Sequence, residues 1–312
     1  MIDFRYHLVS IVSIFLALAV GIVLGAGPLK EDLGNTLTSE VKNLRTDKAT
    51  LRAELDQADR GTKARDDFTI ASNRTLLAGR LTDTTVAVVA LPGADAGLVK
   101  STTAALTAAG AKIGSSIQVQ DSWVDPDKES FRTSLGQQLA SAVGVPLDSQ
   151  GTVIDAVLAR SLLSKAGGGS TGARQALETL RTGDLIKYSS DTVVPASVAV
   201  VVSGPVTGSD SAQRTARATA LAQLSVAIDG AGSGAVLTST SAVPGATNVS
   251  SVVTSVRDDN DMSDVLSTVD DGEVPMGEAS VVFGLLEQEA GKAGHYGLAG
   301  DAAASFPQLA TK

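Results

Sequence analysis

The most regular hydrophobic pattern lies at the start of the chain. Leu8–Gly27 is an uncharged run of about 20 residues, the length a helix needs to cross a ~30 Å hydrocarbon core. A cleavable signal peptide has a shorter apolar stretch, and Pro28 directly after the small residues disfavours cleavage here. A buried soluble helix is the third interpretation. We predict an uncleaved transmembrane helix over 8–27, with the tail 1–7 inside and the long remainder exported, because Arg5 and the amino terminus give the tail a small positive excess.

Small residues recur within this run. Ala17, Gly21 and Gly25 are spaced four apart and form a ridge on one helix face. Such a ridge lets two helix backbones approach closely in lipid. Glycine is also common in membrane helices for other reasons. Pairing of two membrane helices and a chance spacing both remain open.

From 28 to 80 the apolar positions change to a heptad repeat, which predicts a coiled-coil stalk. The core positions follow a 4-3 alternation: Leu37, Val41, Leu44, Lys48, Leu51, Leu55 and Ala58. Lys48 at one core position costs stability but can set register and partner number. Mixed charges flank the repeat: Glu40, Lys42, Arg45, Asp47, Arg52, Glu54 and Asp56. The alternative is a single amphipathic helix lying on its own domain. Gly61 is expected to weaken the helix and to mark its end or a joint.

From Thr84 onward, short β-branched runs alternate with helical patterns, which is typical of a parallel sheet covered by helices. Two strand-helix-strand units are visible: Thr85–Leu91, Ala96–Ala109 and Ala111–Val119, then Ser197–Ser203, Ser211–Ile228 and Ala235–Ser239. Further helices are expected at Asp127–Val143, Thr152–Ser164 and Ala173–Arg181, with a flexible loop at Gly167–Ser170. Asp95 is placed to cap the helix expected at Ala96–Ala109. The fold class is therefore α/β, with a Rossmann-like parallel-sheet domain over 81–298 and a short tail at 299–312.

The turns after the strands lack nucleotide-binding signatures. The first turn offers only Gly93 and Gly97 instead of G-x-G-x-x-G. Gly167 and Gly172 have the outer spacing of a phosphate loop, but Ala173 and Arg174 stand where the Lys and Ser/Thr are required. We expect a sheet domain without a nucleotide motif.

Composition narrows the function classes. Lys and Arg total 25 against 34 Asp and Glu, a formal charge of -9, and nucleic-acid binding needs a basic surface instead. The chain has no cysteine, which removes disulfides, Cys-based metal sites and thiol catalysis. The chain has only two histidines, His7 and His295, so few residues could serve as the base of a Ser-His-Asp triad. We expect no nucleic-acid partner, no cofactor and no enzymatic activity.

Two further groups of residues contain side chains that can bind metal ions. The acidic stretch Asp258, Asp259, Asp261, Asp264, Asp270, Asp271 and Glu273 does not fit an EF-hand loop, so we predict a solvated acidic loop. Copper ligands are few: Met1, Met262, Met276 and the two histidines. His295 lies in a glycine-flanked turn, where a lone histidine is more often structural. We expect no dedicated copper site in one chain.

Three segments, in this order along the chain, resemble a known family: MIDFRYHLVSIVSIFLALAVGIVLGAGPL, VAVVALPGAD and STVDDGEVPMGEASVVFGLLEQEAGKAGHYG. The chain is similar to the actinobacterial copper-transport outer-membrane protein family (MctB-type) over almost its whole length. The resemblance implies copper efflux or homeostasis, with a pore as the agent. It also extends to cell-separation members (SteB-type), which implies a single-span coiled-coil protein that pairs with a SteA-type membrane partner and promotes a peptidoglycan hydrolase.

The residues themselves bear on these roles. Outer-membrane barrels need many alternating strands, whereas the two clear strand groups here are uniformly apolar. One helix cannot enclose a channel, so a pore would require oligomerisation. The anchor, the ridge and the heptads together favour a non-catalytic envelope scaffold that forms homo- or hetero-oligomers through the coiled coil. A copper-handling protein is the second hypothesis, and an enzyme with an α/β site is the third.

Overall fold

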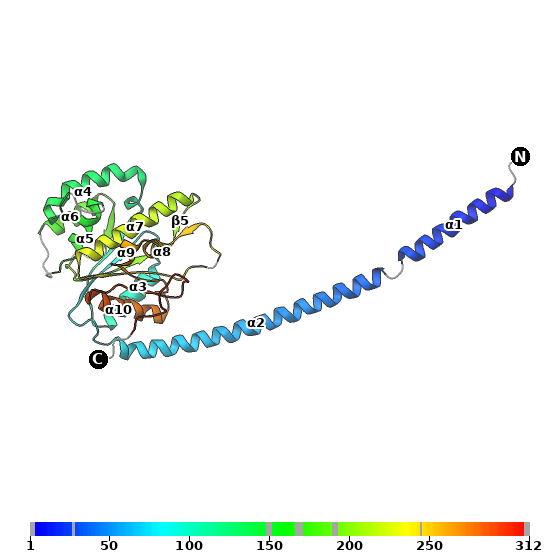
Figure 1. Cartoon of the computed structure of the whole chain (residues 1–312), viewed down its shortest axis with the longest axis horizontal. Helices are drawn as coiled ribbons and strands as arrows, with labels where there is room; N and C mark the ends of the chain where they lie inside the picture. The colour runs from blue at the N-terminus through cyan, green and yellow to red at the C-terminus, as the bar shows by residue number, and fades with distance from the viewer. Residues whose placement is uncertain are drawn as a thin grey trace. The chain divides into compact units, whose positions relative to one another are not determined.

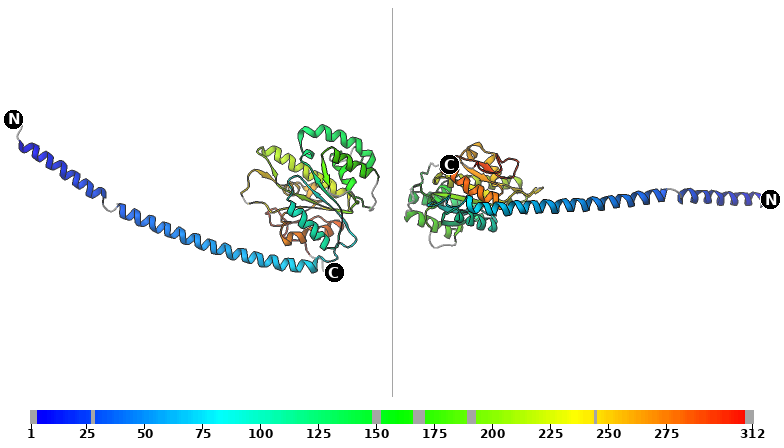
Figure 2. Two further views of the ribbon diagram at one scale, coloured as in Figure 1. Left: turned by 180° about the vertical axis from the view of Figure 1, so that it is seen from behind. Right: turned by 90° about the horizontal axis from the view of Figure 1, so that it is seen from below.

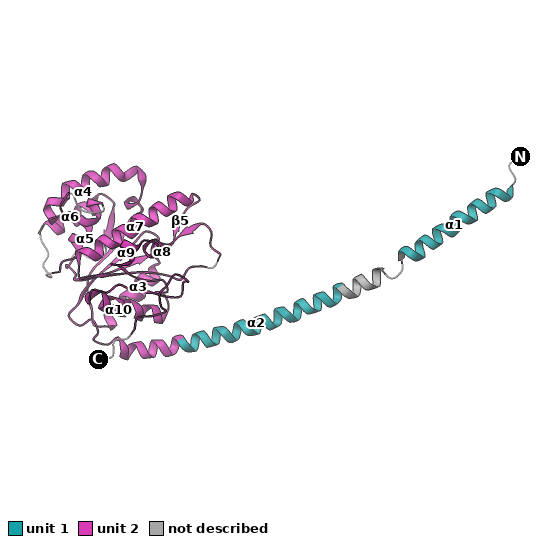
Figure 3. Cartoon of the chain, viewed as in Figure 1, with its two compact units in different colours: residues 1–65 teal, residues 66–312 magenta. Residues whose placement is uncertain are grey.

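The computed structural model describes residues 4–26, 29–147, 152–165, 171–188, 193–243 and 245–308. The chain divides into two units, residues 1–65 and 66–312 (Figure 3). The first unit is purely helical in its described part, and the second contains every described strand (Figure 1).

The first unit begins with the apolar helix α1, Phe4–Ala26. A helix long and apolar enough to cross a membrane was predicted here and is present: Phe4–Gly25 has a mean hydropathy of 2.8, and none of it is buried. The helix starts four residues before the predicted span at Leu8, because Phe4 to His7 continue the same turn. Gly27, the predicted last residue, lies outside the described residues.

The helix α2, Leu29–Leu76, contains the heptad positions and runs on from the first unit into the second. The expected end or joint at Gly61 is wrong, since the helix passes through this residue without a break. One glycine costs a helix about 1 kcal/mol, too little to interrupt good helix formers on both sides. The C-terminal turns of α2 belong to the second unit, where Asn73 Nδ2 donates to Pro275 O at 2.7 Å.

The second unit is built on a seven-stranded sheet in the order β3-β2-β1-β4-β6-β8-β9. The strands are β1 Thr85–Ala90, β2 Lys112–Val119, β3 Ile186–Tyr188, β4 Val198–Ser203, β6 Ala235–Ser239, β8 Ser267–Val269 and β9 His295–Tyr296. Every neighbouring pair is parallel except β2 and β3. A separate antiparallel pair is formed by β5, Val206–Thr207, and β7, Val249–Ser250. The predicted α/β class with a mostly parallel sheet is confirmed.

Helices cover both faces of this sheet (Figure 2). They are α3 Ala96–Ala108, α4 Glu129–Val143, α5 Val153–Leu162, α6 Thr171–Thr182, α7 Ser211–Ala231, α8 Val252–Arg257, α9 Asn260–Ser263 and α10 Pro275–Glu289. On one face, α3 and α10 pack on Val86, Val88 and Val200 through side chains such as Leu106 and Leu285. The other face packs Val89 and Val201 against the larger group that includes α5 and α7. Val-rich strands suit this arrangement, because both of their faces are buried.

Both predicted strand-helix-strand units are present, with ends within three residues of those expected. The cap is also confirmed, since Asp95 Oδ1 accepts from Leu98 N at 2.8 Å. The three intervening helices are α4, α5 and α6, and α4 is preceded by a 3-10 turn at Pro126–Lys128. The loop expected at Gly167–Ser170 lies outside the described residues. The short strands β3, β8 and β9 were not predicted, because two or three residues give too little alternation to read.

Candidate functional site

The edge of the sheet where parallel strands end is the usual ligand position in this type of fold, at the point where the strand order reverses. Here that point lies between β1 and β4. The two turns that follow these strands meet through their glycines: a Cβ added to Gly204 would lie 1.7 Å from Gly93 O. The backbones are therefore in contact where a nucleotide would enter. This closure agrees with the missing phosphate motif in both turns.

A buried ion-pair network lies after β8. Arg257 Nη1 donates to Asp270 Oδ2 at 2.6 Å and to Asp301 Oδ1 at 2.7 Å, while the Arg257 side chain is only 3% exposed. Its other nitrogens donate to Thr268 Oγ1 and to Tyr296 O. Asp270 also accepts from the backbone N–H groups of Leu298 and Ala299. The network ties α8, β8, β9 and the segment after β9 together.

The prediction of a solvated acidic loop is wrong for Asp270 and Asp271, which are both buried. Asp270 is compensated by Arg257. Asp271 has no hydrogen-bond partner for either carboxylate oxygen among the described residues. Burial, with help from the charges of Asp270 and Glu273, raises the pKa of Asp271 to about 6. Sequence charge density alone could not distinguish these two carboxylates from the exposed ones at Asp258 and Asp259.

His295 is held by hydrogen bonds at both ring nitrogens. Nε2 lies 3.1 Å from Ser263 O, and Nδ1 lies 2.9 Å from Thr268 Oγ1. Because a carbonyl only accepts, Nε2 carries the proton, and Nδ1 accepts from the threonine hydroxyl in the neutral ring. Burial and the nearby Arg257 lower the pKa of His295. Either ring nitrogen would have to give up a protein hydrogen bond to bind a metal.

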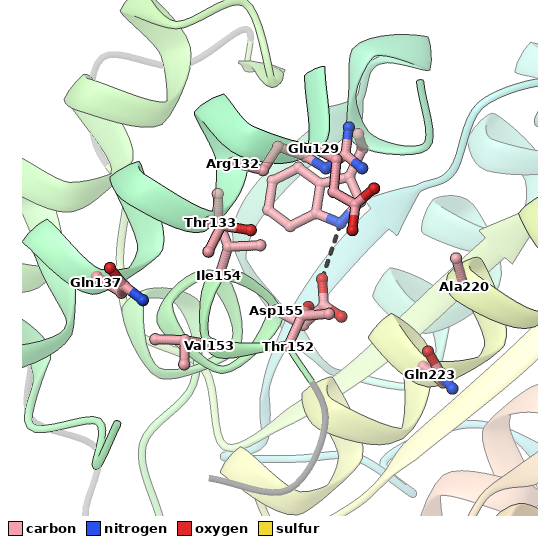
Figure 4. Close-up of a pocket in the computed structure, with 11 residues that line it drawn as sticks. Glu129, Arg132, Thr133, Gln137, Thr152, Val153, Ile154, Asp155, Ala220 and Gln223 are labelled. Atoms are coloured by element: carbon pink, nitrogen blue, oxygen red, sulfur yellow. Dashed lines mark hydrogen bonds between the residues drawn. The ribbon is translucent and has the colours of Figure 1, made fainter. Parts of the chain in front are cut away.

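A pocket of about 250 Å³ lies between the first halves of α4 and α5 and the middle of α7 (Figure 4). Its polar lining comes from Glu129, Arg132, Thr133, Gln137, Thr152, Asp155 and Gln223. Trp123 Nε1 donates to Asp155 Oδ1 at 2.9 Å, as the dashed line in Figure 4 shows. Burial raises the pKa of Asp155 to about 6. This carboxyl can therefore gain or lose a proton close to neutral pH.

The sequence did not single out Trp123 or Asp155. One signal was present, because the T-x-x-D spacing of Thr152 and Asp155 at a helix start resembles a capping box. In the structure Asp155 is only 5% exposed. Its carboxyl accepts a hydrogen bond from the indole of Trp123, which lies 32 residues earlier in the sequence. That contact depends on how α5 packs, which no local pattern reveals.

The predicted seam residues lie on α2 as one exposed stripe. Leu37, Leu44, Leu51 and Leu55 are 60–68% exposed, and Val41 is 39% exposed. Lys48 and Ala58 are exposed as well. A shallow groove along the helix is lined by Leu44, Asp47, Lys48, Leu51, Arg52 and Leu55. Large apolar side chains in such a row are unusual on a free surface and indicate a binding face.

The small-residue ridge also lies on one exposed helix. Ala17, Gly21 and Gly25 are exposed on α1. A Cβ added at Gly21 or Gly25 would meet nothing within 4 Å. The spacing therefore leaves a smooth face open to lipid or to a second helix.

The family described as "Copper transport outer membrane protein, MctB" matches residues 1–307. The chain belongs to the MctB family. Similar relatives are the proteins named "Copper transporter MctB" of Mycobacterium tuberculosis and Mycobacterium bovis, each 28% identical over 308 residues, covering 95% of this chain and 96% of the relative. The protein of the same name in Mycobacterium leprae is 27% identical over 312 residues, covering 96% of each chain. The resemblance inferred from the sequence is confirmed.

Because the MctB family is described by copper transport, the positions of the methionine and histidine side chains, which can bind copper, are of interest. Met262 lies on α9, Met276 on α10, and His295 on β9. Met1 lies outside the described residues. In the part of the chain that the structure describes, no group of three or more His, Cys, Asp or Glu side chains is placed to hold a metal ion.

Proposed function

We propose that this MctB-family chain is a membrane-anchored cell-envelope protein that acts by binding partners and has no catalytic role. In this proposal α1 stays attached and spans the membrane once, and the bulk of the chain is extracytoplasmic. The observation that carries the proposal is the exposed leucine stripe of α2. It is supported by the family match along the chain and by the apolar helix at its start.

The stripe favours association for an energetic reason. Burying one leucine side chain contributes about 1.5–3 kcal/mol, and four leucines of the stripe are now largely in water. A long helix that packs on nothing gains stability mainly from an amphipathic contact. Pairing of α2 with another helix provides that contact and explains the heptad spacing.

The described geometry of the second unit supports a non-catalytic role. At the β1–β4 strand ends the turns touch at Gly93 and Gly204, and the pocket beside them has a volume of only about 80 Å³. The titratable groups Arg257, Asp270 and His295 are engaged with one another or with backbone groups that fasten the C-terminal segment. These contacts suit a rigid head that presents a surface to partners.

Copper transport is the function named for the mycobacterial relatives. For this chain we propose that any copper movement depends on an assembly, because a single membrane helix cannot enclose a channel. A deletion strain should then show altered copper tolerance, restored by the wild-type chain. The double variant Leu44→Asp/Leu51→Asp, which blocks assembly, should fail to restore it.

The second candidate function is cell separation, in which α2 pairs with a SteA-type membrane partner and promotes a peptidoglycan hydrolase. The exposed stripe favours this role equally. Deletion would then leave daughter cells unseparated at unchanged copper tolerance. The two phenotypes distinguish the candidates in one strain.

The test of the shared proposal is association of the full chain in its own membranes. Leu44→Asp/Leu51→Asp should reduce amine-reactive crosslinking into higher species at least tenfold. Thr46→Asp/Ala53→Asp places the same two charges on the opposite side of α2 and should leave crosslinking unchanged. Equal crosslinking in the seam variant and the wild type, at equal membrane abundance, would overturn the proposal.

A further inference from the structure

The exposed stripe of α2 has flanking charges arranged in a fixed order. We propose that its partner is a second copy of this chain, paired in parallel and in register. This inference rests on the proposed association and identifies the partner. In the heptad notation a to g, position d holds Leu37, Leu44 and Leu51, and position a holds Val41, Lys48 and Leu55.

The residues at the core positions favour a coiled coil of two helices. Leucine at d with a β-branched residue at a favours a parallel dimer over trimers and tetramers, and the first heptad has this combination in Leu37 and Val41. A lysine at a single a position also specifies register and oligomer state. In a parallel dimer the two Lys48 side chains lie at the same level and reach outward past the groove to water. Any shift by one heptad would place Lys48 against Val41 or Leu55 and bury its charge beside an apolar side chain.

The flanking charges select the direction. The g positions are acidic at Glu40, Asp47 and Glu54, and the e positions are basic at Arg45 and Arg52. In a parallel pair each g residue faces the e residue of the next heptad on the other helix. Glu40 then faces Arg45, and Asp47 faces Arg52, on both sides of the dimer.

The antiparallel arrangement reverses this balance. There g residues face g residues and e residues face e residues, so acids meet acids and arginines meet arginines. One parallel pair, Glu54 with Asp59, is unfavourable. Two attractive pairs on each side still outweigh it, whereas an antiparallel dimer gains only an Arg45–Asp59 pair, and only in one register.

The position of the anchor agrees with this direction. α1 ends at Ala26, and α2 begins at Leu29. Two copies that span the same membrane through α1 therefore start their α2 helices on the same side and at the same level. A parallel pair in register needs no further displacement of either copy.

All of these residues are free of packing within their own unit. Every position from Leu37 to Arg60 is exposed along α2. The groove lined by Leu44, Lys48, Leu51 and Leu55 is the kind of hole that receives a leucine from a facing helix.

The absence of cysteine from the sequence makes the first experiment direct. Leu37→Cys and Leu55→Cys are introduced singly into the full chain in membranes, and mild oxidation is followed on a non-reducing gel. A parallel pair in register should give a disulfide-linked dimer at both positions. Ala53→Cys, on the outer side of the helix, should give at least tenfold less. An antiparallel pair can bring a residue close to its own copy at only one level, so a dimer at one of the two sites overturns the inference.

The second experiment tests the charges in the Leu37→Cys background. Arg45→Glu/Arg52→Glu makes both sides of the first two g–e pairs acidic, and Glu40→Lys/Asp47→Lys makes both sides of the same two pairs basic. Each variant alone should lose the disulfide dimer about tenfold, and co-expression of the two should restore it as a mixed dimer. Lys42→Glu/Arg60→Glu changes the charge equally at outer positions and should retain the dimer. The inference is overturned if the control variant loses as much of the disulfide dimer as the flank variants, or if co-expression of the two flank variants restores no dimer.

The outcomes separate this inference from the proposed function. If Leu44→Asp/Leu51→Asp abolishes crosslinking but no disulfide forms at either position, the seam binds a different protein. The partner-binding function then stands and the second copy is rejected. If the seam variant has no effect, the proposed function fails before the identity of the partner matters.

Discussion

Trp123 is the only tryptophan of the chain, and its indole N–H donates to the buried carboxyl of Asp155. Its emission should therefore report the charge of that carboxyl. We expect a fluorescence transition with a midpoint at about pH 6, where Asp155 titrates. Asp155→Asn keeps an acceptor oxygen for the indole but has no titration, and its emission should be flat from pH 4.5 to 7.5. A transition of equal size in the variant would contradict the assignment.

The same carboxyl makes stability depend on pH. Its pKa rises from 3.8 to about 6 on folding, so the folded state holds a proton that the unfolded state has lost between these values. Stability from this group is full below about pH 4 and falls as the pH rises to 6. The loss amounts to at most about 3 kcal/mol. The free energy of unfolding, measured with denaturant, should fall less between pH 4.5 and pH 7.5 in Asp155→Asn than in the wild type.

Arg257 and Arg181 form ion pairs in opposite surroundings, which gives a matched comparison. Arg257 is buried against Asp270, whereas Arg181 and Glu178 are about half exposed. Arg257→Met leaves a buried carboxylate without its partner and should cost about 3–5 kcal/mol. Arg181→Met should cost far less, because solvent screens this exposed pair. Thermal unfolding of the two variants measures the difference, and equal losses would mean that burial does not decide the energy of the Arg257 network.

These residues show which parts of the site a sequence can indicate. The segment from Ser267 to Gly297 is one of the three that resemble the family, and it contains Asp270, His295 and Tyr296 of the buried network. Its physical state was misjudged, because seven acidic residues in one stretch look solvated. Arg257 supplies the compensation through a contact 13 residues away in sequence. Burial of a charge depends on such a partner, and the acidic pattern does not reveal it.

At the scale of elements, long regular patterns were predicted well, and short or irregular ones were not. β1 and β4 are continuous Val-rich runs and β6 is a short, mostly apolar run, so their existence and the parallel pairing of β4 with β6 followed from the sequence. β8 and β9 are short, and their pairing depends on the Arg257 network and on the turn around His295. For α2 the opposite error occurred. Gly61 was expected to end or bend the helix, but the helix runs through it.

Substitution of two glycines tests how the effect of a glycine on stability depends on its position in the structure. Gly61 is helical, and a Cβ there would meet nothing within 4 Å, so Gly61→Ala should stabilise α2 by about 0.5–1 kcal/mol. Gly204→Ala should instead destabilise the second unit, because the new Cβ would overlap Gly93 O. Circular dichroism during thermal unfolding of the full chain compares the two. Destabilisation by Gly61→Ala would show that the glycine has a role the helix itself does not reveal.

At the scale of the whole molecule, the family match, the apolar helix and the exposed seam lead to one arrangement in the cell. In the proposed function the chain is anchored by α1, and everything after it lies outside the cytoplasm. The tail before α1 carries Arg5 and the amino terminus, and a positive flank is retained on the cytoplasmic side. This topology places the α2 seam and the second unit in the same compartment as their partners.

Ser209→Cys tests that topology, because Ser209 is exposed before α7 and the chain has no other cysteine. A membrane-impermeant maleimide should label the variant fully in intact spheroplasts, with no increase after lysis. Labelling only after lysis would place the second unit in the cytoplasm and remove it from envelope partners. Mass spectrometry of the labelled protein should also recover peptides that include α1, since an anchor is retained whereas a signal peptide is removed. A mature chain beginning after residue 27 would release the second unit from the membrane, and the common starting level of two α2 helices would be lost with it.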